Sequence, residues 1–168
     1  MTLSYSFIIP VYNRPDEVRE LLHSISELKF EEAFEVVIVE DGSTISSETV
    51  VKKFADKLDI TYLPTSNTGP GDSRNYGMRN ARGNYFLILD SDVLLPAHYL
   101  KEVDSSLKNR FVHCFGGPDA AHRNFTPIQK AINYTMTSFL TTGGIRGRKQ
   151  MVGKFQPRSF NMGISEEA

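Results

Sequence analysis

The chain has 168 residues, of which 40% are apolar and 23% charged, and its formal net charge is −1. These values are typical of one globular domain with a substantial core, and they argue against a nucleic-acid partner. No stretch has the length of a membrane span, and the N-terminus lacks the basic start of a secretion signal. The lone Cys114, which we expect in the core, fits a reducing compartment. We therefore expect a cytoplasmic location, with the inner face of the membrane as the alternative.

Short apolar runs alternate with helical spacings along the chain. The apolar runs predict strands over 7–11, 36–39, 60–63, 85–89 and 111–115. Amphipathic spacing and start signals predict helices over 15–28, 49–58, 72–81, 98–108 and 127–140. Asn13 is the expected N-cap of the first helix. The alternation predicts an α/β fold with a mostly parallel, doubly wound sheet and flanking helices.

The last part of the chain gives weaker signals. Residues 141–154 are rich in glycine and basic side chains, which could hold an anion but are better interpreted as a solvated loop. The segment Ser165-Glu166-Glu167 is typical of the first turn of a helix, and the rest of that helix is missing. The chain thus stops without an element that closes the fold. We therefore expect the chain to be a fragment, truncated at its C-terminal end.

The segment 85–93 carries the most informative pattern, an apolar run that ends in two carboxylates. In a strand, Asp90 and Asp92 would point to the same side at the carboxyl end, where open α/β sheets bind ligands. Two hard oxygen ligands suit a divalent cation whose shell is completed by phosphate oxygens and water. The alternative is a turn that Asp90 caps while Asp92 is solvated. The uninterrupted apolar run before the pair favours the metal site.

Two other polar positions gain weight beside that pair. Asp41 lies in an Asp-Gly-Ser turn, and a turn or a carboxylate that accepts hydrogen bonds from a base or ribose are equally good interpretations. Arg74 could bind phosphate or base edges through paired donors, although a solvated helix arginine is slightly favoured when it is considered alone. The four histidines lack metal-ligand spacing, and the glycines match no phosphate-loop or dinucleotide fingerprint.

Taken together, these residues resemble the inverting family-two glycosyltransferases, which have the GT-A fold of nucleotide-diphospho-sugar transferases. The matching segments follow the order of the family: 7–13, 36–43, 67–69 with 74–77, 83–92 and 160–164. Glu40 stands where the family usually has an aspartate. Each motif alone is weak, but their order makes the resemblance specific. It implies one domain over 1–168, with a nucleotide-binding portion over about 1–117 and an incomplete acceptor portion over about 118–168.

The resemblance also implies a role for individual residues in holding the donor. Pro10 and Tyr12 would flank the base of the nucleotide. Asp41 would bind the base or the ribose, and Arg74 would help to hold the nucleotide. The donor expected first is a UDP-sugar.

Metal and acceptor positions follow from the same resemblance. Asp92 would be the main ligand of a Mn²⁺ or Mg²⁺ ion, with Asp90 facing the ribose or the metal. Asn161 and Met162 would lie on the acceptor side. The implied reaction is metal-dependent hexosyl transfer, with inversion, to a glycan or lipid-linked acceptor in polysaccharide biosynthesis.

No convincing counterpart of the family's general base is present. Glu166 and Glu167 come too soon after the segment 161–163, so we expect the base beyond Ala168 and expect this fragment to be inactive without it. A non-catalytic nucleotide-binding module is the main alternative. A sugar nucleotidyltransferase ranks lower, because the residues after the first strand, 12–16, are not a glycine-rich basic loop.

Overall fold

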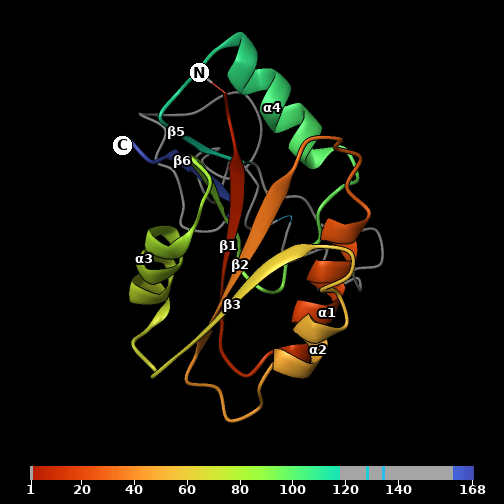
Figure 1. The fold of residues 1–168 in the computed structure, drawn as a ribbon, viewed down its shortest axis with the longest axis vertical. Helices are drawn as coiled ribbons and strands as arrows, with labels where there is room; N and C mark the ends of the chain where they lie inside the picture. The colour runs from red at the N-terminus through yellow and green to blue at the C-terminus, as the bar shows by residue number, and fades with distance from the viewer. Residues whose placement is uncertain (1, 118–127, 129–133, 135–160) are drawn as a thin grey trace. The chain divides into compact units, whose positions relative to one another are not determined.

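The structure is a computed structural model that describes residues 2–117, 128, 134 and 161–168. Within these residues one six-stranded sheet is formed by Tyr5–Val11 (β1), Phe34–Asp41 (β2), Asp59–Thr65 (β3), Tyr85–Ile88 (β4), Cys114–Gly116 (β5) and Met162–Ser165 (β6) (Figure 1). The helices are Pro15–Ser26 (α1), Glu48–Lys52 (α2), Pro70–Asn80 (α3) and Tyr99–Asn109 (α4). The helix expected over 127–140 and the basic loop over 141–154 lie outside the described residues.

The strand order of the sheet is β3-β2-β1-β4-β6-β5. The pairs β1–β2, β2–β3 and β1–β4 are parallel, whereas β6 runs antiparallel to β4. The prediction of a mostly parallel α/β sheet with flanking helices is therefore confirmed. The parallel strands bring their carboxyl ends to one edge of the sheet, which is where this architecture holds ligands.

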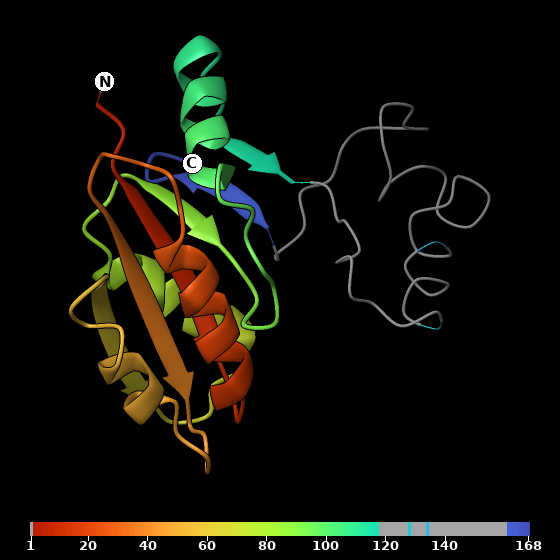
Figure 2. The ribbon, with the colours of Figure 1, turned by 90° about the vertical axis from the view of Figure 1, so that its right-hand side faces the viewer.

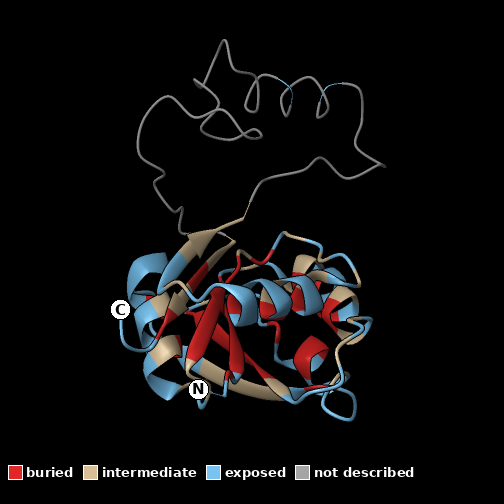
Figure 3. Ribbon diagram, turned by 90° about the horizontal axis from the view of Figure 1, so that it is seen from above, coloured by how far each residue is buried: buried red, intermediate tan, exposed pale blue. Residues whose placement is uncertain are grey.

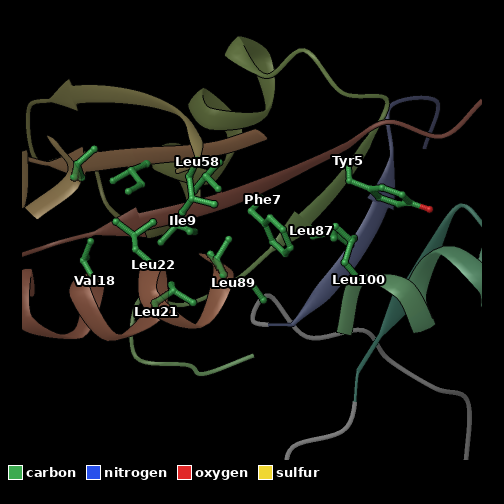
Figure 4. Close-up of a cluster of buried hydrophobic side chains, with 14 of the residues drawn as sticks. Tyr5, Phe7, Ile9, Val18, Leu21, Leu22, Leu58, Leu87, Leu89 and Leu100 are labelled. Atoms are coloured by element: carbon green, nitrogen blue, oxygen red, sulfur yellow. The ribbon is translucent and has the colours of Figure 1, made fainter. Parts of the chain in front are cut away.

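Side chains alternate between two cores because successive residues of a strand point to opposite faces. Phe7 and Ile9 of β1 join Leu21 and Leu22 of α1 in the larger core, which α4 also enters (Figure 4). Ile8, between them, joins the smaller core on the face that α3 covers. Figure 2 shows α1 and α3 on opposite sides of the sheet, and Figure 3 shows that the central strands are buried while the outer sides of the helices are exposed.

Gly77 determines how closely α3 approaches the sheet. A Cβ at this position would lie 2.8 Å from Cγ2 of Ile8 and 3.1 Å from Cγ2 of Val39. The glycine that weakens the helical pattern in the sequence is thus required by packing. Gly71, in the first turn of the same helix, has open space where a Cβ would be.

These two glycines give a matched test. Gly77→Ala is expected to lower the free energy of unfolding by about 1–3 kcal/mol, because the added methyl group overpacks the smaller core. Gly71→Ala is expected to leave stability unchanged or to raise it by up to about 1 kcal/mol, since alanine favours the helix. Urea unfolding measures both changes. An equal gain in both variants would show that α3 does not need the small residue.

Several local predictions differ from the structure. Asn13 does not cap α1: the N-cap position is Arg14, and the Asn13 side chain accepts hydrogen bonds from the turn 44–45 instead. The predicted helix 49–58 ends at Lys52, because the following hydrogen bonds, such as Lys53 N to Val50 O, span three residues rather than four. The strand predicted over 111–115 begins at Cys114 instead and lies at the edge of the sheet, and Cys114 is exposed and not in the core.

The prediction that a helix opens at Ser165 is also wrong. Met162–Ser165 is a strand, and Ser165 ends it rather than opening a helix. Gly163 is buried against Phe115 of β5: a Cβ there would lie 2.1 Å from the Phe115 ring.

None of the described helices is long and apolar enough to span a membrane.

Candidate functional site

A cleft of about 530 Å³ lies where the carboxyl ends of β1, β2 and β4 meet. Its lining comes from four places: the end of β1 with the turn after it, the last residue of β2, the loop into α3 with the first turns of that helix, and the segment after β4. The lining residues are Pro10, Val11, Tyr12, Arg14, Asp41, Asn67, Gly69, Pro70, Arg74, Asp90, Ser91 and Asp92. All five donor-binding positions and both metal positions that the sequence predicted are among them.

Asp90 and Asp92 follow β4, which ends at Ile88 rather than at Leu89 as predicted. Their side chains are 41% and 58% exposed, so both carboxylates are accessible from the cleft. Each faces an arginine: Nη2 of Arg74 donates to Oδ1 of Asp90 at 2.8 Å, and Nη1 of Arg14 lies 3.8 Å from Oδ2 of Asp92. The first contact is a hydrogen-bonded ion pair, while the second is a looser one that solvent screens.

The donor set of this pair fits a divalent cation that shares its shell with a ligand. No cluster of three or more acidic, histidine or cysteine side chains suitable for a metal occurs in the described part of the chain. Two carboxylates beside each other in an open cleft leave positions for phosphate oxygens and water, which Mg²⁺ and Mn²⁺ commonly retain. The residues therefore suit an ion that arrives with a diphosphate better than a closed structural metal site.

Arg74 is held by α3 with its guanidinium at the cleft. Its side chain is only 16% exposed, and its Nε is buried without a hydrogen-bond partner among the described residues. A buried donor of this kind is uncommon in a folded protein. Arg74 thus brings positive charge to the side of the cleft where Asp90 lies, while its Nε stays buried.

Asp41 ends β2 and is buried, although it lines the cleft. Its Oδ1 accepts a hydrogen bond from the backbone N–H of Thr68 at 2.7 Å, and its Oδ2 accepts one from that of Gly69 at 2.9 Å. Burial raises the pKa of Asp41, but these N–H donors outweigh it and hold the pKa below its ordinary value. The carboxylate also lies at the N-terminus of α3, which favours negative charge.

The loop that Asp41 holds can approach only because residue 42 is a glycine. Gly42 has a φ of +69°, and a Cβ there would lie 2.5 Å from the backbone nitrogen of Asn67. Asp41 therefore has a structural task in addition to the predicted one. Among the described contacts its Oδ2 accepts a single hydrogen bond, so it keeps acceptor capacity for a ligand.

Tyr12 and Pro10 form the wall of the cleft that comes from β1. The Tyr12 side chain is 50% exposed, which is unusual for a large aromatic residue directly after a buried strand. Pro10 is half-buried beside Val11. An exposed ring over a polar cleft is suited to stack against a planar ligand.

Asn161 and Met162 lie at the same edge of the sheet but do not line the cleft. Oδ1 of Asn161 accepts a hydrogen bond from the hydroxyl of Tyr99 at 2.9 Å, and Met162 pairs with Ile88 at the carboxyl end of β4. Glu166 lies at the opposite edge, where its backbone N–H donates to the carbonyl of Asn84. That position keeps Glu166 away from the candidate site.

Arg14 and Asn67 both line the cleft, but the sequence suggested no role for Arg14 and named Asn67 only as part of the matching segment 67–69. The available signals were the positions of these residues: Arg14 lies in the turn after the first strand, and Asn67 lies in the loop before the third helix. Glu40 was noted only as a departure from the usual aspartate. In the structure it is buried and accepts hydrogen bonds from Ser47 N at 2.7 Å and Tyr62 Oη at 3.0 Å.

Sequence comparison gives the site its context. The family model described as Glycosyl transferase family 2 matches residues 6–164. The poly(ribitol-phosphate) beta-N-acetylglucosaminyltransferase TarS of Staphylococcus aureus is 36% identical over 103 residues, which are 60% of this chain and 18% of TarS. Glycosyltransferase GlyA of Streptococcus pneumoniae serotype 4 is 36% identical over 96 residues, which are 56% of this chain and 14% of GlyA. The chain thus spans less than a fifth of these two relatives.

Solved structures agree with the sequence comparison. The crystal structure of S. aureus TarS 1-349 in complex with UDP-GlcNAc has a TM-score of 0.66 at 29% identity, covering 74% of this chain and 37% of that one. The mannosyltransferase PcManGT from Pyrobaculum calidifontis, in complex with GDP-Man and Mn²⁺, has a TM-score of 0.72 at 21% identity and covers 99% of this chain and 46% of that one. The second likeness concerns the fold alone.

Proposed function

Because the chain belongs to glycosyl transferase family 2, we propose that it binds a nucleotide-diphospho-sugar in the cleft and contributes this site to an inverting sugar transfer. The observation that carries the proposal is the meeting of Tyr12, Asp41, Arg74, Asp90 and Asp92 in one cleft at the carboxyl ends of neighbouring strands. We propose a UDP-sugar as the donor, since S. aureus TarS was crystallised with UDP and with UDP-GlcNAc.

Each part of the donor has a matching group in the cleft. The ring of Tyr12 is available to stack on the base, with Pro10 beside it. Asp41 is ionised at neutral pH because its pKa is lowered, so it accepts hydrogen bonds from N–H groups of the base or hydroxyls of the ribose. Arg74 supplies charge-assisted donors for the diphosphate.

Asp92 and Asp90 would hold a Mn²⁺ or Mg²⁺ ion at the diphosphate end, with Asp92 as the main ligand. When bound, such an ion supplies positive charge that stabilises the departing diphosphate. With such an ion bound, Arg14 would give up its loose contact with Asp92, and Arg74 would be shared between Asp90 and the phosphate oxygens. Both arginines would remain beside the diphosphate, which carries two negative charges, so the attraction between the arginines and the donor would be kept.

In the proposed transfer, an acceptor hydroxyl oxygen bonds to the anomeric carbon while the bond from that carbon to the diphosphate oxygen breaks. The electron pair of the broken bond leaves with the diphosphate, and the hydroxyl proton goes to a general base that we place beyond Ala168. Asn161 and Met162, which begin β6 at this edge, are proposed to border the acceptor side. The proposed acceptor is a glycan or a lipid-linked glycan in cytoplasmic polysaccharide synthesis.

Calorimetric titration of the chain with UDP, GDP and dTDP, each with and without Mn²⁺, tests the proposal. We expect Mn²⁺-dependent binding that is tightest for UDP. A folded chain that binds none of the three nucleotides in the presence of Mn²⁺ would contradict the proposal. Binding of every nucleoside diphosphate with equal affinity would contradict the assignment of UDP.

A further inference from the structure

Glu40, the residue before Asp41, has a buried side chain whose hydrogen bonds are all made within the protein. It is 4% exposed, and both carboxylate oxygens are occupied. Oε1 accepts a hydrogen bond from the Ser43 hydroxyl, and Oε2 accepts hydrogen bonds from Ser47 N at 2.7 Å and Tyr62 Oη at 3.0 Å. A buried charge with three donors is fixed in place, because removing any donor leaves part of the charge unsatisfied. Glu40 therefore acts as an anchor for the turn after β2.

The turn after β2 is also hydrogen-bonded to Asn13, the residue that follows Tyr12. The Ser43 hydroxyl, while donating to Glu40, accepts a hydrogen bond at 2.7 Å from the backbone N–H of Asn13. That N–H belongs to the peptide bond between Tyr12 and Asn13. Asn13 has a φ of +55°, a left-handed conformation that asparagine tolerates better than most residues.

The Asn13 side chain completes the connection between the two turns. Its Oδ1 accepts hydrogen bonds from Thr44 N at 2.8 Å, Ile45 N at 2.9 Å and Thr44 Oγ1 at 3.0 Å. The turn after β1 thus has little freedom to move independently of the turn after β2. Tyr12 itself is half-exposed, and it is not among the side chains that pack against either core in the described part of the chain.

From this chain of contacts we infer that Glu40 is a positioning residue for Tyr12, acting through Ser43 and the Tyr12–Asn13 peptide to aim the ring at the base of the donor. The inference rests on the proposed function, because it assigns the ring a nucleotide to face. It gives the carboxylate that replaces the usual aspartate a task distinct from that of Asp41. Asp41 meets the ligand, whereas Glu40 sets the wall against which the ligand stacks.

The opposite end of β2 offers a matched control. Glu35 is also 4% exposed, and it accepts a hydrogen bond from the Ser6 hydroxyl at 2.6 Å. That hydroxyl accepts one at 3.0 Å from the backbone N–H of Gly83. Ser43 and Ser6 therefore make the same relay from a buried glutamate to a turn, but only Ser43 does so at the cleft. Ser6→Ala costs stability without reaching the ligand.

The experiment measures UDP affinity by calorimetry in the presence of Mn²⁺, together with melting temperature, for Ser43→Ala, Glu40→Ala and Ser6→Ala. We expect Ser43→Ala and Glu40→Ala to weaken UDP binding about tenfold, the lower end of what stacking a base on an aromatic ring contributes. Ser6→Ala is expected to lower the melting temperature without changing UDP affinity. In a Tyr12→Ala background, Ser43→Ala should cause no further loss, because the group that it positions is gone.

Three results would overturn the inference alone: unchanged affinity in Ser43→Ala, an equal loss in Ser6→Ala, or the full loss of affinity from Ser43→Ala persisting in the Tyr12→Ala background. If Glu40→Ala fails to fold, Ser43→Ala and the double variant still decide the question, since they remove only a hydroxyl and an exposed ring. Absence of UDP binding by the wild-type chain would instead overturn the proposed function, and the inference with it.

Discussion

Asp92→Asn is expected to weaken Mn²⁺-dependent UDP binding by about 100-fold or more, since residues that merely support a metal ligand cost roughly 10–100-fold when changed. The amide removes the negative charge that we assign to the metal and leaves Arg14 with Glu17 as its remaining carboxylate contact among the described residues. Metal-free UDP binding should stay the same or tighten slightly, because the released arginine faces the diphosphate. Titrations with and without Mn²⁺ separate the two effects.

Asp16→Asn provides the control for Asp92. Asp16 is also an exposed aspartate paired with an arginine, Arg19, at 2.7 Å, but it lies in the first turn of α1 and outside the cleft. Its removal should cost at most about 0.5 kcal/mol of stability and should not change UDP affinity. Equal effects of the two variants on Mn²⁺-dependent binding would mean that Asp92 is only part of a turn.

Asp41→Asn should have two large effects. The amide has one oxygen and one NH₂ group, so it cannot accept from both Thr68 N and Gly69 N, and one of these donors loses its partner. Because these donors are only partly buried, we expect the free energy of unfolding to fall by about 1–2 kcal/mol and UDP affinity to fall with it. Urea unfolding and calorimetry measure these losses.

The pH dependence of the free energy of unfolding tests independently whether the ionised carboxylate of Asp41 stabilises the fold. Because its pKa is lowered in the folded protein, the ionised carboxylate stabilises the fold above its ordinary unfolded pKa of about 4, and this contribution is lost as the pH falls through the lowered folded value. The stability difference between the wild type and Asp41→Asn should therefore shrink on acidification below about pH 4. Asp56→Asn, which changes an exposed aspartate outside the cleft, should leave both the free energy of unfolding at neutral pH and UDP affinity unchanged. A pH-independent difference would mean that the charge of Asp41 is unimportant.

β1, β2 and β4 could be predicted because each contains an apolar run that is buried on both faces, whereas β3 at the edge of the sheet is only partly buried. β6 could not, since its residues Met162-Gly163-Ile164-Ser165 include a glycine and a serine, and these are the two that are buried. They are tolerated there because Gly163 makes room for the Phe115 ring and Ser165 Oγ lies 2.9 Å from Nδ1 of His113. Such requirements depend on neighbours that are distant in the sequence.

The candidate site divides in the same way. Residues such as Tyr12, Asp41 and Asp92 could be proposed to gather, because all follow strands that end at one edge. Their partners could not be read from the sequence: the approach of Arg14 to Asp92 depends on how the turn after β1 folds. Asn13 has the residue type of a helix N-cap, yet its oxygen serves a turn of the neighbouring strand.

The insertion of β6 between β4 and β5 has a consequence for the order of folding. β1, β2, β3 and β4 follow one another along the first part of the chain, whereas β6 can pair with β4 only after the long stretch of chain between them, residues 89–161, has been closed into a loop. Closing a longer loop costs more conformational entropy, and such contacts form late. We therefore expect the four parallel strands to assemble first and β6 to join last. The cleft, whose lining comes from the early strands and the segments beside them, would then exist before β6 is in place.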